Sequence, residues 1–379
     1  MKRKFLLAHD RLTPCHPNDA ELNVNRSLKQ IDRADSRLQS KPFTGFDFRR
    51  PALALAFLFL FAPYAAKAAD SAVIVMYHRF GENNVPSTNI RLEQFEAHLK
   101  HLKDGGYRVL PLGEIADALQ SGKELPEKAV AITIDDAYLS VFKEAWPRLK
   151  ANGFPFTLFV TTKDIDGGAK LYMSWDQLRE MAKSGVSIGN HSATHPHMAD
   201  LAPEAVQQEF AHSQARFKEE LGQAPSLMAY PYGEASLAVI EQARKAGFKV
   251  GFGQHSGVAH LGGPLFYLPR FALNEHYGDV ERFRQAVDAL PLAVTQILPA
   301  DPALKASPAA FVLALKEDAP KGFHCFDANG TPARAEIEGR KVTVTLAKPF
   351  GPGRGRISCT APAANGRWRW FGHQVIIVK

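Results

Sequence analysis

The stretch AVAITIDD at residues 129–136 joins a continuous apolar run to two adjacent carboxylates. A short apolar run of this kind is typical of a strand that is buried on both faces of a parallel sheet. Asp135 and Asp136 would then stand at the carboxyl end of that strand. Because burying unpaired carboxylates is costly, the pair indicates either a solvated cap on the next helix or a site that binds a cation or a substrate.

Similar runs recur on both sides of this stretch. We expect strands over 72–77, 156–160, 186–189, 227–230 and 248–251. Apolar residues at helical spacing lie between them, as in 174–185, where Ser174 can cap the helix, and in 203–222. Repeated strand–helix units predict an α/β fold with a parallel sheet, open or closed. A closed barrel would gather the loops that follow its strands at one rim.

The pattern changes near residue 300, where a proline-containing stretch over 299–308 is typical of a linker. Short strand-like runs follow, with Gly- and Pro-rich turns between them. We therefore expect an N-terminal extension with a signal peptide (1–68), a large α/β domain (69–300) and a small β-rich C-terminal domain (301–379). In the last domain, Trp368 and Trp370 alternate with arginines, which favours a half-buried strand over a sugar-stacking surface.

Residues 49–68 have the layout of a secretory signal. Arg49 and Arg50 precede an apolar run over 51–62, and the small residues that follow end in a cleavage-site pattern, AKA. The apolar run is about half of the ~20 residues that a membrane-spanning helix needs. We expect export to the periplasm or the medium, with membrane attachment only if the segment stays uncleaved. Residues 1–48 lack such a pattern, and the sequence leaves open whether they are translated.

The cysteines agree with export. Cys15 lies ahead of the proposed cleavage site, whereas Cys325 and Cys359 both lie in the C-terminal segment. In an oxidising compartment such a pair can form a disulfide, and two buried free thiols are the alternative.

Composition narrows the class of protein. The chain has 379 residues, of which 45% are apolar and 22% charged, so its bulk is neither disordered nor collagen-like. The formal net charge of +7 is unevenly spread: +6 over 1–68, −5 over 69–300 and +6 over 301–379. Because the long middle segment is acidic and has no basic run, we do not expect a nucleic-acid partner.

Two histidines, His191 and His195, follow the expected strand 186–189. At this spacing both rings can converge on one metal ion, and one Asp would complete three protein ligands with a position left open. Imidazole and carboxylate suit zinc, and cobalt, nickel or iron also fit. A Pro-aromatic-Gly turn at 231–233 ends the next strand. It is either an ordinary turn or one that directs a backbone N–H toward a developing oxyanion.

In order along the chain, TIDDA at 133–137, HSATH at 191–195 and AYPY at 229–232 resemble the motifs of the polysaccharide deacetylases of carbohydrate esterase family 4. The resemblance covers roughly residues 70–295, and VMYH at 75–78 is similar to the first strand of members that act on exported polysaccharide. It implies a distorted (β/α) barrel and metal-dependent hydrolysis that removes acetyl groups from N-acetylated sugars.

The resemblance also implies roles for individual residues. By position, Asp135 is the general base, and the backbone N–H of Tyr232 stabilises the oxyanion. The implied ligands of a divalent metal, most simply Zn²⁺, are Asp136, His191 and His195.

Two positions depart from the family pattern. Ala229 stands where the family has an arginine that orients the base, and we hypothesise that Arg270 supplies this charge from another strand end. The family's late Leu-x-His, which supplies the general acid, is not evident near residue 290. His255 is our candidate for that acid, with His260 and His276 as weaker alternatives.

The implied substrate is a polysaccharide of the cell envelope that contains N-acetylglucosamine. Poly-N-acetylglucosamine, peptidoglycan and a capsular or lipid-linked sugar all remain open, and we expect the chain to act as a monomer. The rival hypothesis is a weakly active or inactive deacetylase-like protein that binds glycan without turnover.

Overall fold

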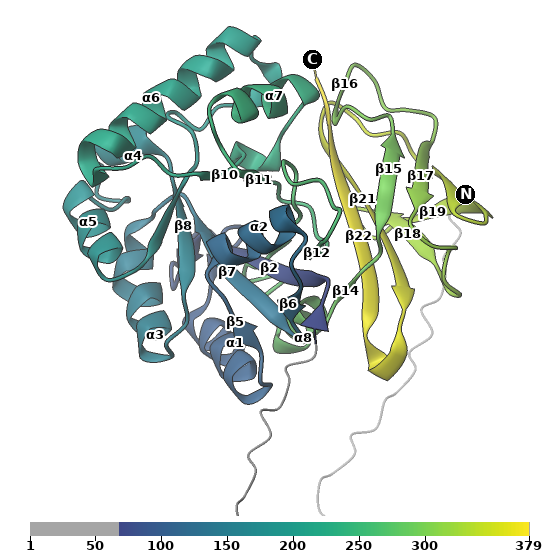
Figure 1. The fold of residues 1–379 in the computed structure, drawn as a ribbon, viewed down its shortest axis with the longest axis horizontal. Coiled ribbons are helices and arrows are strands. Elements are labelled where there is room, and N and C mark those ends of the chain that lie inside the picture. Colours follow the sequence, from purple (N-terminus) through teal and green to yellow (C-terminus); the bar gives the residue numbers. More distant parts are fainter. Residues whose placement is uncertain (1–67, 379) are drawn as a thin grey trace, which may run out of the picture. The chain divides into compact units, whose positions relative to one another are not determined.

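The computed structural model describes residues 68–378, which contain two large sheets (Figure 1). The predicted N-terminal extension and signal peptide lie outside the described residues, except for Ala68. Among the residues described, no helix has both the length and the apolar character needed to cross a bilayer.

The first sheet is curled and mainly parallel, and its core strands match the predicted runs. In spatial order it contains β11 (Val250–Phe252), β10 (Leu227–Ala229), β9 (Ser187–Asn190), β8 (Phe156–Val160), β7 (Ala129–Asp135), β2 (Ser71–Tyr77) and β12 (Ala259–His260). Two short strands, β5 (Arg108–Val109) and β13 (Phe271–Ala272), pair in parallel with β7 and β2. The strand β12 is antiparallel to β2.

The chain between β12 and β13 links the two edges of this sheet. Leu268 bridges to Phe252 of β11, and Phe271 of β13 pairs with Val75 of β2. The sheet therefore closes on itself as a distorted (β/α) barrel, which confirms the predicted fold class. The carboxyl ends of its parallel strands share one rim, where the chemistry of such folds resides.

Helices pack on the outside of the barrel (Figure 1). They are α1 (Leu92–Asp104), α2 (Leu112–Ser121), α3 (Trp146–Ala151), α4 (Thr162–Asp166), α5 (Trp175–Lys183), α6 (Pro203–Leu221), α7 (Leu237–Lys245) and α8 (Val280–Val287). The predicted cap of α5 is confirmed, since the Ser174 hydroxyl accepts a hydrogen bond from the Gln177 N–H. β11 begins two residues later than predicted, because Phe248 packs against Phe210 of α6 instead of joining the strand.

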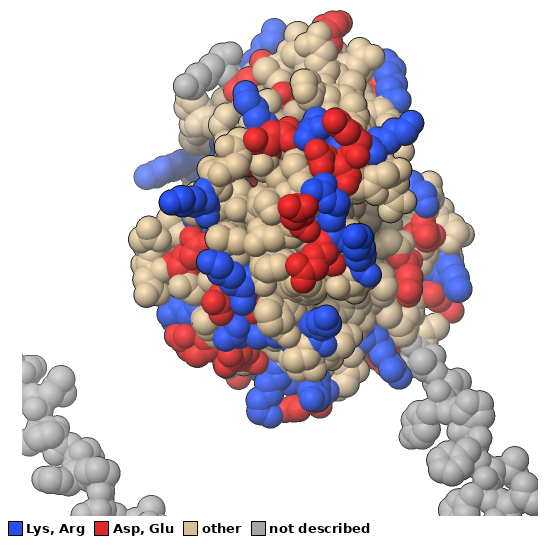
Figure 2. Space-filling view, turned by 90° about the vertical axis from the view of Figure 1, so that its left-hand side faces the viewer, with Lys and Arg blue, Asp and Glu red and all other residues tan. Residues whose placement is uncertain are grey.

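Charges on the α5–α6 face are locally paired. Figure 2 shows Lys and Arg interspersed with Asp and Glu on the side of the molecule that carries these helices. Arg216 of α6 bonds to Asp166 and Glu220, and Arg179 of α5 also bonds to Glu220. Exposed pairs of this kind contribute little stability each, and they leave this face with mixed charge.

The second sheet confirms the expected all-β C-terminal region. Its order is β14 (Leu290–Pro291), β22 (Trp368–Ile377), β21 (Gly353–Pro362), β18 (His324–Asp327), β19 (Pro332–Glu338), β20 (Lys341–Thr345), β17 (Phe311–Leu315) and β15 (Val294–Leu298), with β16 (Ala303–Leu304) beside β22. Alternate residues such as Phe311 and Leu313 are fully buried in its own core. Because β14 and β15 precede the expected linker, we propose that this domain begins just after α8.

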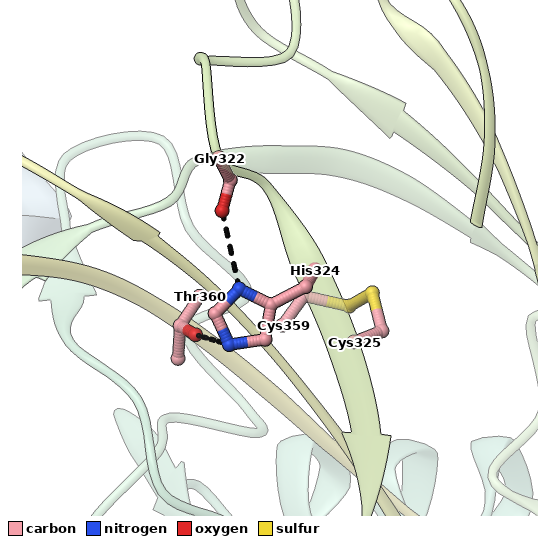
Figure 3. The surroundings of a disulfide bond; sticks show 5 residues. All are labelled: Gly322, His324, Cys325, Cys359 and Thr360. Atoms are coloured by element: carbon pink, nitrogen blue, oxygen red, sulfur yellow. Dashed lines mark hydrogen bonds between the residues drawn. A yellow bond between two sulfur atoms is a disulfide. The ribbon is translucent and has the colours of Figure 1, made fainter. Parts of the chain in front are cut away.

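Cys325 of β18 and Cys359 of β21 form a disulfide, which was one of the two alternatives left open by the sequence. The two residues are directly opposite each other in the ladder, and both are buried. Figure 3 shows the neighbouring His324, whose ring hydrogen-bonds to the Gly322 carbonyl and the Thr360 hydroxyl. The bond thus ties together strands that belong wholly to the second sheet.

Replacing both Cys325 and Cys359 by Ser is expected to lower the free energy of unfolding by about 3 kcal/mol, because the bridge closes a loop of intermediate length in the unfolded chain. The bridge joins residues that are 34 positions apart. Urea unfolding of the oxidised protein and the double variant measures the difference. A reducing agent should destabilise the wild type and leave the double variant unchanged; equal midpoints for wild type and variant would contradict the prediction.

Candidate active site

The predicted metal ligands meet at the rim of the barrel. Asp136 follows β7, and His191 and His195 follow β9. The Asp136 Oδ1 lies 3.5 Å from the His191 Nε2 and 3.6 Å from the His195 Nε2. The barrel therefore brings these ligand atoms together from two separate loops, within 4.8 Å of one another.

Their arrangement fits a bound metal ion. In tetrahedral sites with bonds of about 2.0–2.2 Å, ligand atoms lie about 3.4 Å apart, close to the separations found here. The His191 Nε2 is buried and has no hydrogen-bond partner among the described residues. An unpaired buried nitrogen is costly, and a cation held between the three side chains would satisfy it. The exposed fractions are 0% for the His191 side chain and 23% for the His195 side chain, so one side of the site is open to solvent.

Hydrogen bonds orient the two histidines. The His191 Nδ1 lies 2.7 Å from the Ala229 carbonyl, so Nδ1 carries the proton and the Nε2 lone pair faces Asp136. Glu209 of α6 accepts hydrogen bonds from the N–H groups of Ala193 and Thr194, which hold the loop between the histidines. Burial, and then the neighbouring His191 ring, lower the pKa of His195 to about 4. His195 can thus present a neutral nitrogen to a cation.

Backbone strain is concentrated at the same rim. Asp136, Ala137, Ser192, His195 and Tyr232 all have left-handed φ values, between 54° and 72°. For residues with a Cβ this region costs about 1–3 kcal/mol each and persists where the surroundings impose it. Ala137, which replaces the glycine of the family motif, adopts the conformation that glycine would take without strain. Such clustering is typical of a functional site.

Asp135 directly precedes the metal-ligand candidate Asp136 and is paired with Arg270. Both side chains are fully buried, and the guanidinium NH1 and NH2 lie 2.7 and 2.8 Å from the two carboxylate oxygens. Burial is the largest single influence and raises the pKa of Asp135, but the charge and hydrogen bonds of Arg270, together with the nearby His191 and His78, lower that pKa to about 2. Arg270 also donates to the Gly253 carbonyl. Arg270, just before β13, thus contacts the residue that it was hypothesised to orient, and its role stays a prediction.

Tyr232 lies beside His195, one of the three metal-ligand candidates. Its ring centroid is 4.4 Å from that of His195 and 4.1 Å from that of His197, on which it stacks. The turn's own backbone hydrogen bonds run from Gly233 to Tyr230 and from Glu234 to Pro231, and the Tyr232 N–H takes part in neither. The turn's own backbone bonds therefore leave this N–H available as a donor to an oxyanion.

The structure does not bring His255 into this cluster. Its ring packs against Tyr267 and lies 6.5 Å, between centroids, from His373 of the second sheet. Burial, followed by the charge of His373, lowers its pKa well below the usual range. The weaker candidates also lie elsewhere: His260 is on β12, and the His276 ring packs against Tyr277.

His78 is a residue that we did not single out for chemistry. It directly follows β2, and it is half-buried. Tyr77 of β2 pairs in parallel with Ile134 of β7, so His78 and Asp135 are the next residues of two adjacent strands at the rim. The signal was present in VMYH at 75–78, because His78 ends a parallel strand just as Asp135 does.

Comparisons with known proteins agree with this site. A family model described as polysaccharide deacetylase matches residues 122–251. The Bacillus subtilis protein YxkH, named as a polysaccharide deacetylase, is 34% identical over 197 residues, which cover 52% of this chain and 69% of that protein. The poly-β-1,6-N-acetyl-D-glucosamine N-deacetylase of Escherichia coli K12 is 26% identical over 223 residues, which cover 48% of this chain and 33% of that enzyme.

A solved structure of IcaB from Ammonifex degensii is also similar. Its TM-score is 0.51 at 28% identity, and the match covers 56% of this chain and 96% of that one. Together, the barrel, the motif residues at its rim and these relatives show that the chain belongs to the polysaccharide deacetylase family, carbohydrate esterase family 4.

Proposed function

We propose that this protein is an exported, metal-dependent hydrolase that removes N-acetyl groups from a polysaccharide of the cell envelope containing N-acetylglucosamine. The observation that carries the proposal is the placement of the Asp136, His191 and His195 ligand atoms beside a fully buried Asp135–Arg270 pair. Relatives named as deacetylases of poly-β-1,6-N-acetyl-D-glucosamine support the substrate class. The disulfide supports an oxidising compartment.

In this proposal, Asp136, His191 and His195 hold the metal. When bound, such an ion polarises the acetamide carbonyl and lowers the pKa of water, so that a nucleophile forms near neutral pH. Asp135 accepts the proton of the attacking water as general base. Arg270 keeps that carboxylate ionised and aims both of its oxygens, because its two N–H groups bind them in a fork.

The remaining steps need an oxyanion donor and an acid. The backbone N–H of Tyr232 donates to the negative oxygen that develops as the carbonyl is attacked. A protonated side chain must then donate to the departing sugar amine. We assign this role to His78 in preference to His255, since His78 follows β2 beside the end of β7 that carries Asp135, whereas His255 packs between Tyr267 and the second sheet.

Changing His78 to Asn is expected to lower kcat for acetate release about 100-fold, because general acid catalysis contributes at least that factor. The matched variant His255→Asn should keep kcat within a few-fold of the wild type while losing some stability, since it alters a buried packing residue. Steady-state rates of acetate release, measured for both variants and the wild type, distinguish the two candidates. A larger loss of kcat in His255→Asn than in His78→Asn would instead make His255 the general acid.

Acetate release from metal-loaded protein tests the function itself. Poly-β-1,6-N-acetylglucosamine, chitin oligomers and peptidoglycan form the substrate panel, and Zn²⁺, Co²⁺, Ni²⁺ and Fe²⁺ the metal panel. We expect release from at least one glycan, loss of release after chelation, and recovery when one of these ions is returned. Glycan binding without acetate release under every condition would instead establish the non-catalytic alternative.

A further inference from the structure

The second sheet reaches the turn that carries Tyr232. From β22, the Gln374 Nε2 donates to the carbonyls of Tyr232 and Gly233, at 3.1 and 2.9 Å. The Tyr267 hydroxyl, from the barrel, donates to the same Gly233 carbonyl at 2.9 Å. We propose that Gln374 is a positioning residue for the oxyanion-binding turn, so that the C-terminal domain completes the active site. This inference rests on the proposed deacetylase function.

The direction of the Gln374 amide is fixed by its surroundings. The side chain is fully buried, and its Oε1 lies 2.7 Å from the Arg356 Nε of β21. An arginine nitrogen can only donate, so the oxygen of the amide must face Arg356 and the NH2 group must face the turn. Gln374 is therefore held as a double donor to two neighbouring carbonyls.

The turn needs such external support. Tyr232 has φ 58°, ψ 6°, a left-handed conformation that is unfavourable for a residue with a Cβ. Gly233 also has a positive φ, and a Cβ at this position would lie 2.4 Å from the Gln254 nitrogen. Since buried carbonyls without donors are costly, the three hydrogen bonds from Gln374 and Tyr267 favour this strained conformation.

A second strand of the same sheet also contacts the turn. The Arg354 guanidinium of β21 lies 5.6 Å from the centre of the Tyr232 ring, and its Nε is 3.7 Å from the buried Glu234 carboxylate. Glu234 also pairs with His197, on whose ring Tyr232 stacks. The C-terminal domain thus contacts both the backbone and the side chain of Tyr232, as Figure 1 shows for the position of β21 and β22 beside the barrel.

The metal ligands are held by different groups. His191 is oriented by the Ala229 carbonyl, and the loop to His195 is fastened by Glu209. Loss of the Gln374 hydrogen bonds should therefore disturb the oxyanion donor and leave the metal site largely intact. This separation distinguishes a positioning role from a general structural one.

The test compares Gln374→Leu with Thr360→Val. Thr360 is also buried and lies in the same sheet, but its hydroxyl hydrogen-bonds to His324 of β18 within that sheet (Figure 3). We expect Gln374→Leu to lower kcat about 10- to 100-fold, part of what loss of an oxyanion donor costs, with KM and Zn²⁺ affinity within about two-fold of wild type. Thr360→Val should leave kcat unchanged.

Gln374→Glu is the second variant in case Gln374→Leu is poorly folded. It keeps an oxygen for Arg356 but presents an acceptor to the two carbonyls, so kcat should fall at least as far. Wild-type kcat in either folded variant, or a fall in Zn²⁺ affinity and melting temperature that accounts for the loss, would overturn the inference.

Crystal structures of the variants provide a readout that does not depend on turnover. We expect the 231–233 turn to shift in Gln374→Leu and to stay in place in Thr360→Val. An unchanged turn in the Gln374 variants would overturn the positioning role. Absence of acetate release from the wild type itself would refute the deacetylase function instead, and the crystal comparison would still decide whether Gln374 sets the turn.

Discussion

Asp135→Asn is expected to lower the rate of acetate release by about 10²–10⁴, the range attributed to a positioned general base. An amide has the shape of the carboxylate but cannot accept the proton of the attacking water. The ligand atoms of Asp136, His191 and His195 are not altered. Zn²⁺ should therefore still bind, and isothermal titration alongside the acetate assay measures both properties on one preparation.

The control for this prediction must separate lost chemistry from lost folding, because Asp135→Asn leaves the Arg270 guanidinium buried without its counter-charge. The double variant Asp135→Asn with Arg270→Met removes both charges. It should unfold at higher denaturant than Asp135→Asn and remain inactive. A double variant or single variant with near wild-type acetate release would show that Asp135 is not the base.

Arg270→Met is expected to destabilise the protein by about 3–5 kcal/mol, the usual cost of breaking a buried ion pair on one side. Both partners are fully buried, and the pair spans 135 residues of sequence, so it joins β7 to the segment that closes the barrel. A double-mutant cycle measures this coupling. It compares denaturant unfolding of the wild type, Asp135→Asn, Arg270→Met and the double variant. The double variant should lose less stability than the two single variants together.

Arg270→Met should also change how the stability and activity of the protein depend on pH. In the wild type, burial opposes ionisation of Asp135, but Arg270 and, to a smaller extent, two nearby histidines together lower its pKa to about 2. A lowered carboxyl pKa contributes stability that is complete above the ordinary range near pH 4 and is lost as pH falls toward 2. Removing Arg270 takes away the largest of the influences that lower this pKa, so burial raises it, and the variant should lose stability and activity at higher pH than the wild type.

Arg270→Lys is the matched variant, since it keeps the charge and loses the two-pronged geometry. We expect stability and acid tolerance between those of the wild type and Arg270→Met. If Arg270→Met unfolds at the same denaturant concentration as the wild type and shows the same pH dependence of activity, the ion pair neither stabilises the fold nor keeps Asp135 ionised.

Much of the barrel could be predicted from local sequence. Apolar runs such as 129–134 and 156–160 became central strands, because residues buried on both faces of a parallel sheet must be apolar over their whole length. The cap at Ser174 begins α5, and the glycine after α6 ends that helix, both as expected. The strands β12, β13 and β14 have two residues each, too few for a periodic pattern, and were not predicted. β15 was also missed, because its five residues are neither continuously buried nor regularly alternating.

The sequence by itself determined which residues stand at the carboxyl ends of the strands, including Asp135, Asp136 and His191, because strand ends are a local property. Tertiary structure alone decided which side chains meet. Arg270 pairs with Asp135 only because the segment before β13 closes the barrel, and the His255 ring packs on Tyr267 instead of joining the three metal-ligand candidates. Gln374 contacts Tyr232 from 142 residues away, since β22 packs against the rim. Contacts across such separations depend on how the sheets close and pack, which no local pattern records.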